Sequence, residues 1–286
     1  MPWYELESAS DPRLDELAKQ YNLHPLHIED CRSDSEGIKV DTAPHYTFAV
    51  FKPVRIEDQI AFSTIDIFAG KNFFITIAEP GCRASEEALA RARRDGSDDR
   101  PEKLLYLILD TIVDQYFPAI DQFDDKIDDL EDRVIDSPSP EVLQDVFGIK
   151  RELIDLRRVL VNTRDASLHL QRDPGSIIDA EHQPYIRDIY DHAVRLLDSL
   201  ETQRDLLNNT LDIYLSSVAN RTNEVMKVLT VIGTIALPVI AISGIYGMNL
   251  KGLPLENSPH AALYIGGLTI LSTIVLLAVL RKLKWL

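Results

Sequence analysis

One face of a predicted helix near the C-terminus combines small, hydroxyl and apolar side chains and carries no charge. Its members recur about every 3.6 residues, so they share one side of a helix. They are Thr222, Met226, Leu229, Gly233, Leu237, Ile240 and Gly244. We call this set the uncharged stripe. Its spacing fits two functions equally well: close packing against another helix, or the wall of a water-filled path that apolar rings close by dewetting.

The stripe lies in an apolar segment that ends at Gly247, Met248 and Asn249. No residue between 228 and 250 is charged, and none between 261 and 280 is charged. Each run reaches the roughly 20 residues that a membrane-spanning helix needs. We therefore predict two spans, at about 226–247 and 261–281, rather than a buried hairpin in a soluble domain. From position alone, Asn249 would be a residue at a helix C-terminus.

Basic residues flank the two predicted spans on one side. They are Arg221, Lys227, Arg281, Lys282 and Lys284. Basic flanks favour the cytoplasmic side of a membrane. This pattern predicts a multi-pass membrane protein with both termini in the cytoplasm. Residues 251–260 would form a short outer loop, and residues 282–286 a basic cytoplasmic tail.

Charge and motifs exclude several classes of function. The formal net charge of -16 argues against a nucleic-acid partner, which needs clustered Lys and Arg, and fits a cation partner better. No G-x-x-x-x-G-K-[ST] segment is present, so no nucleotide site is evident. No cluster of nucleophile, base and orienting group emerges, so we expect no enzyme activity. A membrane-anchored scaffold or sensor that does not conduct is an alternative from another class.

The elements before the spans indicate an α+β membrane protein. Residues 1–96 resemble an α/β domain, with β-branched and aromatic segments at 46–56, 60–70 and 72–80. Within 97–182, apolar spacings of three and four predict an antiparallel pair of long helices at 101–136 and 140–171. A stalk helix should run from 183 into the first span, ending by 250. Its expected heptad-like apolar positions are 186, 190, 193, 197, 200, 207, 211, 214 and 218.

Five segments carry a resemblance to a known family. They are "HPLHIED" (24–30), "YIRDIYDH" (185–192), "YLSSVANRTNEVMKVLT" (214–230), "YGMN" (246–249) and the closing "RKLKWL". In this order, and with GMN at the end of the first of two C-terminal spans, they resemble the CorA family of magnesium transporters. The resemblance covers essentially the whole chain.

The resemblance implies a homopentameric funnel in a plasma (inner) membrane of bacterial or archaeal type. The stalk helix would continue into the pore-lining membrane helix of this funnel, with the second span outside it. Gly247, Met248 and Asn249 would form the selective outer mouth, with a ring of Asn249 amides meeting hydrated Mg²⁺. The stripe positions Thr222, Met226, Leu229, Leu237 and Gly244 match pore-lining positions of the family. Asp212 matches an acidic residue near the cytoplasmic mouth. The expected partners are membrane lipid, divalent cations and four further copies of the chain.

The resemblance also implies that intracellular Mg²⁺ regulates the pore by binding carboxylates between subunits. The matching residues are Glu29, Asp30, Asp110, Asp188 and His192. Oxygen ligands suit Mg²⁺, and carboxylates that face each other repel unless a cation lies between them.

The loop after GMN departs from the family pattern, and the identity of the transported ion stays open. After GMN, many family members have "MPEL", whose Glu collects cations, whereas this chain has Lys251, Leu255 and Glu256 in "LKGLPLE". A Zn²⁺, Co²⁺ or Ni²⁺ transporter on the same fold is the alternative. Met248 favours Mg²⁺, because the zinc-transporting branch tends to vary the middle residue of GMN.

Overall fold

The computed structural model describes residues 1–33, 37–57, 59–97, 99–173, 175, 177–248, 252–254, 258–283 and 285. They form two compact units, Met1–Asp212 and Ile213–Leu286. The elements in chain order are β1 (Trp3–Leu6), α1 (Pro12–Gln20), α2 (Pro25–Cys31), β2 (Lys39–Ala43), β3 (Tyr46–Phe51), β4 (Val54–Ile56), β5 (Ile60–Phe62), β6 (Ile65–Gly70), β7 (Phe73–Ala78), α3 (Arg83–Asp95), α4 (Pro101–Asp136), α5 (Pro140–Arg172), α6 (Gln183–Gly247) and α7 (Ala261–Lys282).

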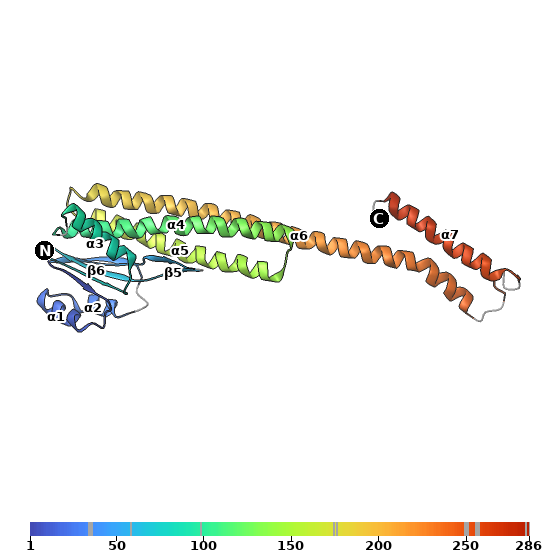
Figure 1. The fold of residues 1–286 in the computed structure, drawn as a ribbon, viewed down its shortest axis with the longest axis horizontal. Coiled ribbons are helices and arrows are strands. Elements are labelled where there is room, and N and C mark those ends of the chain that lie inside the picture. Colours follow the sequence, from blue (N-terminus) through green and yellow to red (C-terminus); the bar gives the residue numbers. More distant parts are fainter. Residues whose placement is uncertain are drawn as a thin grey trace. The chain divides into compact units, whose positions relative to one another are not determined.

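A five-stranded sheet in the order β1-β7-β6-β3-β2 organises the first unit (Figure 1). β1 runs parallel to β7, and the other pairs are antiparallel. Pro53 has no backbone N–H, and the segment 46–56 accordingly divides there into β3 and the short β4, which pairs with β5 in a second sheet. The segments predicted as strands are therefore strands, but β1 and β2 were not anticipated.

The sheet separates two layers of helices. Side chains alternate along each strand, so Phe48 and Phe68 pack with Leu14 and Ile28 on the face that α1 and α2 cover. The buried residues between them in sequence, such as Ile67, point to the opposite face. There the sheet contacts α4 and α5, and α3 packs against α4. Figure 1 shows α1 and α2 on one side of the sheet and the long helices on the other.

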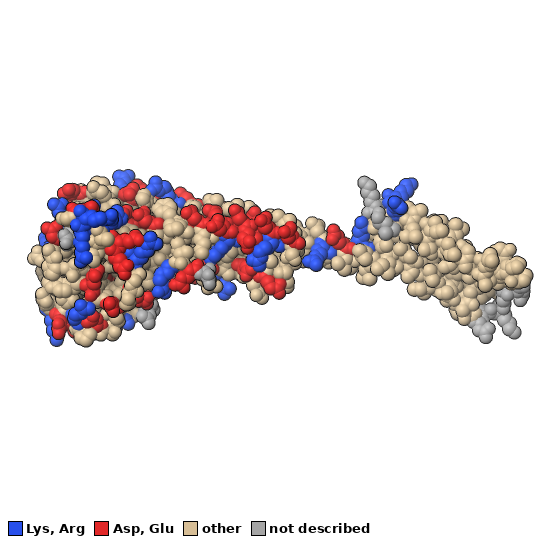
Figure 2. All heavy atoms as spheres, viewed as in Figure 1, with Lys and Arg blue, Asp and Glu red and all other residues tan. Residues whose placement is uncertain are grey.

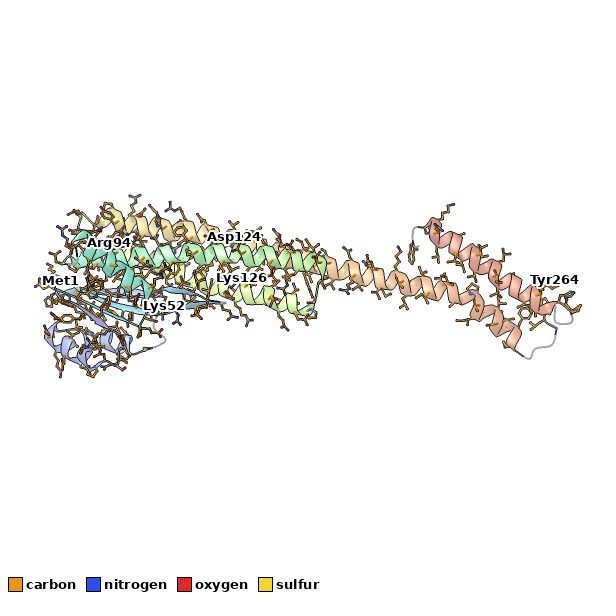
Figure 3. The ribbon with its side chains drawn as sticks, in the orientation of Figure 1. Met1, Lys52, Arg94, Asp124, Lys126 and Tyr264 are labelled. Atoms are coloured by element: carbon orange, nitrogen blue, oxygen red, sulfur yellow. The ribbon has the colours of Figure 1, made fainter. Side chains whose placement is uncertain are left out.

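The long helices of the first unit are held together by polar contacts along their length. Lys126 on α4 pairs with Glu152 on α5 at 3.0 Å, while Arg133 pairs with Asp145 at 2.7 Å, an order that makes α4 and α5 antiparallel. Asp124 accepts a hydrogen bond from Gln203 on α6. Asp124 and Lys126 lie on different sides of α4, one toward α6 and the other toward α5 (Figure 3). The predicted helix pair is confirmed.

The buried seam of α6 differs from the one expected from apolar residues. It consists of Ile186, Ile189, Ala193, Leu196, Leu200, Gln203, Leu207, Thr210 and Tyr214. The expected positions 190, 197, 211 and 218 lie outside it. Positions 186, 193, 200, 207 and 214 are confirmed, but the second row was placed one residue too late where two apolar residues are adjacent, as at Ile189 and Tyr190 and at Leu196 and Leu197. Gln203 and Thr210 were missed because they are polar: the Thr210 hydroxyl lies 3.1 Å from a carboxylate oxygen of Glu131 and 3.0 Å from the Leu206 carbonyl. The bond from Gln203 Nε2 to Asp124 and the bonds of Thr210 offset part of the cost of burying these two side chains.

The second unit contains residues 213–247 of α6 and the helix α7. Both α6 and α7 contain stretches long and apolar enough to cross a membrane, and these stretches are almost entirely exposed. The apolar part of the second unit displays neither acidic nor basic side chains, whereas acidic side chains crowd the long helices of the first unit (Figure 2). Exposed apolar surface of this extent requires lipid or protein partners.

Asp66 is a carboxyl buried within the sheet, on the face covered by α2. Only 5% of the residue is exposed. Burial disfavours the charged form and raises the pKa of Asp66 to about 7, although the Cys31 thiol donates a hydrogen bond to it and Lys52 lies nearby. The first unit therefore contains one core acid that titrates near neutral pH.

We predict that Gly70→Ala destabilises the first unit. A Cβ at Gly70 would lie 2.2 Å from Cε1 of Phe73. That ring is buried and stacks on Tyr21 at 4.1 Å, so it has little room to move. The expected loss is about 1–3 kcal/mol of unfolding free energy, measured by denaturant unfolding of the detergent-solubilised chain. Gly148→Ala is the control: its Cβ meets nothing within 4 Å in the middle of α5, so it should stabilise by up to about 1 kcal/mol. Equal shifts in the two variants would contradict the packing argument.

A second prediction concerns pH. Because the folded pKa of Asp66 lies above its ordinary value, the folded chain holds this proton between about pH 4 and 7 while the unfolded chain releases it. The contribution of Asp66 to stability is therefore lost as pH rises through that window. Relative to wild type, Asp66→Asn should gain about 2–3 kcal/mol of stability between pH 5 and pH 8, measured by denaturant unfolding at each pH. Asp95→Asn, an exposed acid of α3, is the control. Parallel wild-type and Asp66→Asn curves would show that Asp66 is already ionised at pH 5.

Candidate functional site: a membrane stripe and two sets of carboxylates

The apolar members of the uncharged stripe are exposed in the second unit. The exposed fractions are 54% for Met226, 61% for Leu229, 62% for Leu237 and 65% for Ile240. Neither α7 nor the rest of the described second unit covers them. The stripe therefore has to meet something that a single described chain does not supply.

The small members of the stripe make the helix surface smooth and neutral. A Cβ placed on Gly233 or Gly244 would meet no atom within 4 Å. The Thr222 hydroxyl donates to the Val218 carbonyl at 2.9 Å, so its hydrogen is satisfied within the helix while an oxygen lone pair stays available. A face of this kind offers weak oxygen acceptors and no fixed charge.

The stripe runs toward the end of α6. Gly247 is the last residue of the helix, and the N–H of Met248 donates to the Gly244 carbonyl at 3.1 Å. The Tyr246 hydroxyl donates to the Pro254 carbonyl at 3.1 Å, which ties the helix end to the following loop. Asn249 lies outside the described residues, as do Lys251, Leu255 and Glu256. Asp212 is exposed on α6 at the end of the first unit.

Three of the expected regulatory residues come together where α3, α4 and α6 meet. Asp188 and His192 lie one turn apart on α6, with an oxygen of Asp188 3.6 Å from Nε2 of His192. Asp110 on α4 is 8% exposed and receives a 2.7 Å hydrogen bond from Arg91 of α3. The ring of Phe117 contacts that of His192 edge-on, with centroids 5.8 Å apart. We call Asp110, Asp188 and His192 the α4–α6 cluster.

Asp114 is a fourth member of this cluster that sequence reasoning did not single out. Desolvation among its neighbours raises the pKa of Asp114, the charge of Asp110 raises it further, and His192 and Arg91 counteract both. The charge of Asp188 acts in the same direction as that of Asp110. Its position four residues after Asp110 places both on one helix face and could have indicated it. The cluster therefore has an excess of negative charge that a cation would offset.

Glu29 and Asp30 lie in a different part of the first unit, on α2. Asp30 is bound by Lys39, whose Nζ lies 2.6 Å from a carboxylate oxygen and 3.8 Å from Asp41. Asp41 in turn lies 3.8 Å from Nε2 of His27. Glu29 is exposed. Asp30 is therefore partly neutralised, with a second oxygen able to bind a further ligand.

The sheet keeps these two sets of carboxylates apart within one chain. α2 covers one face of the sheet and α4 lies on the other (Figure 1). Asp30 and Asp188 therefore cannot share an ion within one first unit. Any ion held between them has to be held by two copies of the chain.

Comparison with known proteins assigns the chain to a family. A family model described as "CorA-like Mg2+ transporter protein" matches residues 1–282. The cobalt/magnesium transport protein CorA of Thermotoga maritima is 34% identical over 272 residues, which cover 93% of this chain and 78% of that protein. The complete structure of the CorA magnesium transporter from Methanocaldococcus jannaschii, 25% identical, matches with a TM-score of 0.83 over 99% of this chain and 91% of that one. The structure of full-length CmaX, 20% identical, shares the fold with a TM-score of 0.78. The chain belongs to the CorA-like Mg²⁺ transporter family.

Proposed function

We propose that five copies of this chain form a channel that admits Mg²⁺ into the cytoplasm across the plasma membrane. The observation that carries the proposal is the exposed, uncharged stripe of α6, which runs to the Gly-Met-Asn end of a membrane-length helix. Two spans cannot enclose a path, so several copies around one axis are needed. The exposed stripe supplies a surface for that association, and the name of the family supplies the cargo.

The chemistry of the stripe suits an ion that keeps its water. Mg²⁺ prefers octahedral oxygen ligands at about 2.0–2.1 Å and loses water reluctantly. In our proposal, a ring of Asn249 amide oxygens accepts hydrogen bonds from the hydrated ion without stripping it. Leu229, Leu237 and Ile240 form apolar rings that hold water back when the helices are close, which closes the path without a charged plug.

The membrane potential is the proposed driving force. Moving one charge through 100 mV is worth about 2.3 kcal/mol, so a divalent ion gains about twice that on entry. No nucleotide-binding motif is present in the sequence. The basic residues at the ends of the spans orient both termini toward the cytoplasm and contact anionic lipid headgroups there. Asp212, exposed on α6, would collect ions at the cytoplasmic mouth.

We assign gating to intracellular Mg²⁺ bound between copies. Asp30, with Glu29 beside it, would face Asp188 of the next copy, with Asp110 and His192 close by. Since the sheet separates these groups in one chain, binding at this place would bridge two chains. The bound ion offsets the mutual repulsion of the carboxylates, and its loss lets the first units separate. Lys39 and Arg91 limit the negative charge, which would keep the affinity low enough for the ion to leave.

Co²⁺ is a second candidate cargo. The Thermotoga maritima and Methanocaldococcus jannaschii relatives are both named cobalt/magnesium transport proteins. The stripe itself contains no imidazole or thiolate, the ligands that softer ions prefer. We therefore expect Co²⁺ to pass by the same route as a hydrated ion.

The proposed mouth predicts that Asn249→Ala abolishes Mg²⁺ uptake. Removing the amide oxygen takes away the acceptor for the water bound to the ion. Uptake should fall to the background of empty liposomes, measured with an enclosed Mg²⁺ indicator, while the oligomer persists on size-exclusion chromatography. Asn257→Ala, a change of the same type in the outer loop, is the control. Undiminished uptake by Asn249→Ala would refute the role of the Asn249 ring.

The proposed sensor predicts a shift in the inhibition curve. Asp188→Asn and Asp30→Asn each remove one charge from the bridge, so closure should need at least roughly fivefold more internal Mg²⁺, the scale of a coupling energy of about 1 kcal/mol. The measurement is Mg²⁺ flux in liposomes against internal Mg²⁺ concentration. Asp191→Asn, an exposed neighbour on α6, should leave the curve in place. Curves for Asp188→Asn and Asp30→Asn that match wild type would contradict the sensor assignment.

A further inference from the structure

Three metal-ligating side chains meet where α4 and α6 begin, away from the α4–α6 cluster. Glu102 lies in the first turn of α4, and Asp179 and His182 lie in the turn just before Gln183. One carboxylate oxygen from each acid and one ring nitrogen of His182 all lie within 4.8 Å of one another. Segments distant in the sequence thus bring three donor atoms to one point.

The imidazole of His182 is fixed in place. Its side chain is 6% exposed, and Nδ1 lies 2.7 Å from Oδ1 of Asp179. The same oxygen accepts the backbone N–H of His182 at 2.9 Å. In the tautomer in which Nε2 carries the proton, the lone pair of Nδ1 faces this carboxylate oxygen, and a cation bound by both atoms would relieve their repulsion.

The charges around this point also favour a cation. Two carboxylates within 4.8 Å of each other repel unless a positive charge lies between them. Within the described part of the chain, Glu102 forms no ion pair. Its neighbour Lys103 is directed elsewhere, because its ammonium lies over the rings of Tyr106 and Tyr185 at 4.8 and 5.0 Å from their centroids. Among the described residues, Glu102 therefore has no paired cation, and Asp179 has only the His182 ring.

We propose that Glu102, Asp179 and His182 bind a first-row divalent transition-metal ion, with Zn²⁺ and Co²⁺ as the best fits. Imidazole nitrogen suits these ions, whereas Mg²⁺ prefers oxygen donors alone. Three protein ligands at about 2.0–2.2 Å leave a fourth position for water. Modest side-chain rotations would close the 4.8 Å triangle to the roughly 3.5 Å spacing of a tetrahedral site.

Such an ion would join the first turn of α4 to the start of α6. The helix α6 carries both the uncharged stripe and part of the α4–α6 cluster. Binding of a transition metal at its start would therefore act on the same helix as the proposed Mg²⁺ regulation. The ligand set differs from the oxygen-dominated Mg²⁺ ligands proposed above. The inference therefore stands whether or not the chain conducts Mg²⁺.

The test measures Zn²⁺ binding by the full-length, metal-free protein in detergent with excess Mg²⁺ present. Titration calorimetry should detect a Zn²⁺ site whose affinity falls at least about tenfold in His182→Gln and in Glu102→Gln. Co²⁺ added in place of Zn²⁺ should give visible d–d absorption that disappears in His182→Gln. Circular dichroism checks that each variant is folded. Because Glu102 is partly exposed, Glu102→Gln tests the site even if His182→Gln misfolds.

Matched controls separate this site from others. His169→Gln alters another histidine beside an aspartate, 3.6 Å from Asp173, and Glu181→Gln removes an exposed acid between Asp179 and His182. His192→Gln alters the α4–α6 cluster. All three should retain the Zn²⁺ affinity and the Co²⁺ spectrum. Wild-type affinity in a folded Glu102→Gln or His182→Gln protein would overturn the proposal, as would loss of the signal in His192→Gln alone.

Discussion

The structure depends on the backbone hydrogen bonds of one helix, α6, which is continuous from Gln183 to Gly247. Where apolar surroundings exclude water, each N–H and C=O has to be bonded within the helix, because an unpaired group there is costly. Pro238 removes one donor without ending the helix. The same element can therefore carry a packed seam in the first unit and an exposed, uncharged face in the second.

The two ends of α6 differ in their side chains: one end is packed in the first unit, and the other exposes an uncharged face in the second. In the first unit, Gln203 and Thr210 are buried in the seam and hydrogen-bonded to acids of α4. These polar positions fix which side of α6 faces α4, since a rotated helix would leave them unpaired. In the second unit no such polar anchors appear along the stripe, and its packing is left to other copies or to lipid. One helix therefore combines specific polar contacts in the first unit with a neutral, apolar surface in the second.

Periodicity predicted the long helices because their apolar positions recur over many turns, and Pro101, Pro140 and Gly96 mark where helices begin or end. It missed β1 and β2, which are short and are stabilised by pairing with β7 and β3 rather than by their own composition. It placed half of the α6 seam correctly, but it could not choose between adjacent apolar residues such as Leu196 and Leu197, and it could not reveal buried polar side chains that have partners.

The candidate sites were predictable to different degrees. The stripe follows from spacing and absence of charge, and the resemblance supplied Asp110, Asp188 and His192, which the fold brings together. Asp114 and the group of Glu102, Asp179 and His182 depend on tertiary contacts that no single segment shows. The separation of Asp30 from Asp188 by the sheet likewise required the topology.

We propose that a neutral, apolar-lined path passes hydrated Mg²⁺ under the membrane potential alone. The most direct test is ion flux into liposomes with Mg²⁺, Zn²⁺, Co²⁺ and Ni²⁺ compared side by side, at a fixed inside-negative potential, with and without a pH gradient. We expect Mg²⁺ entry that increases with the potential and does not change with the pH gradient. Zn²⁺ flux without Mg²⁺ flux, or Mg²⁺ flux only with a pH gradient, would contradict it.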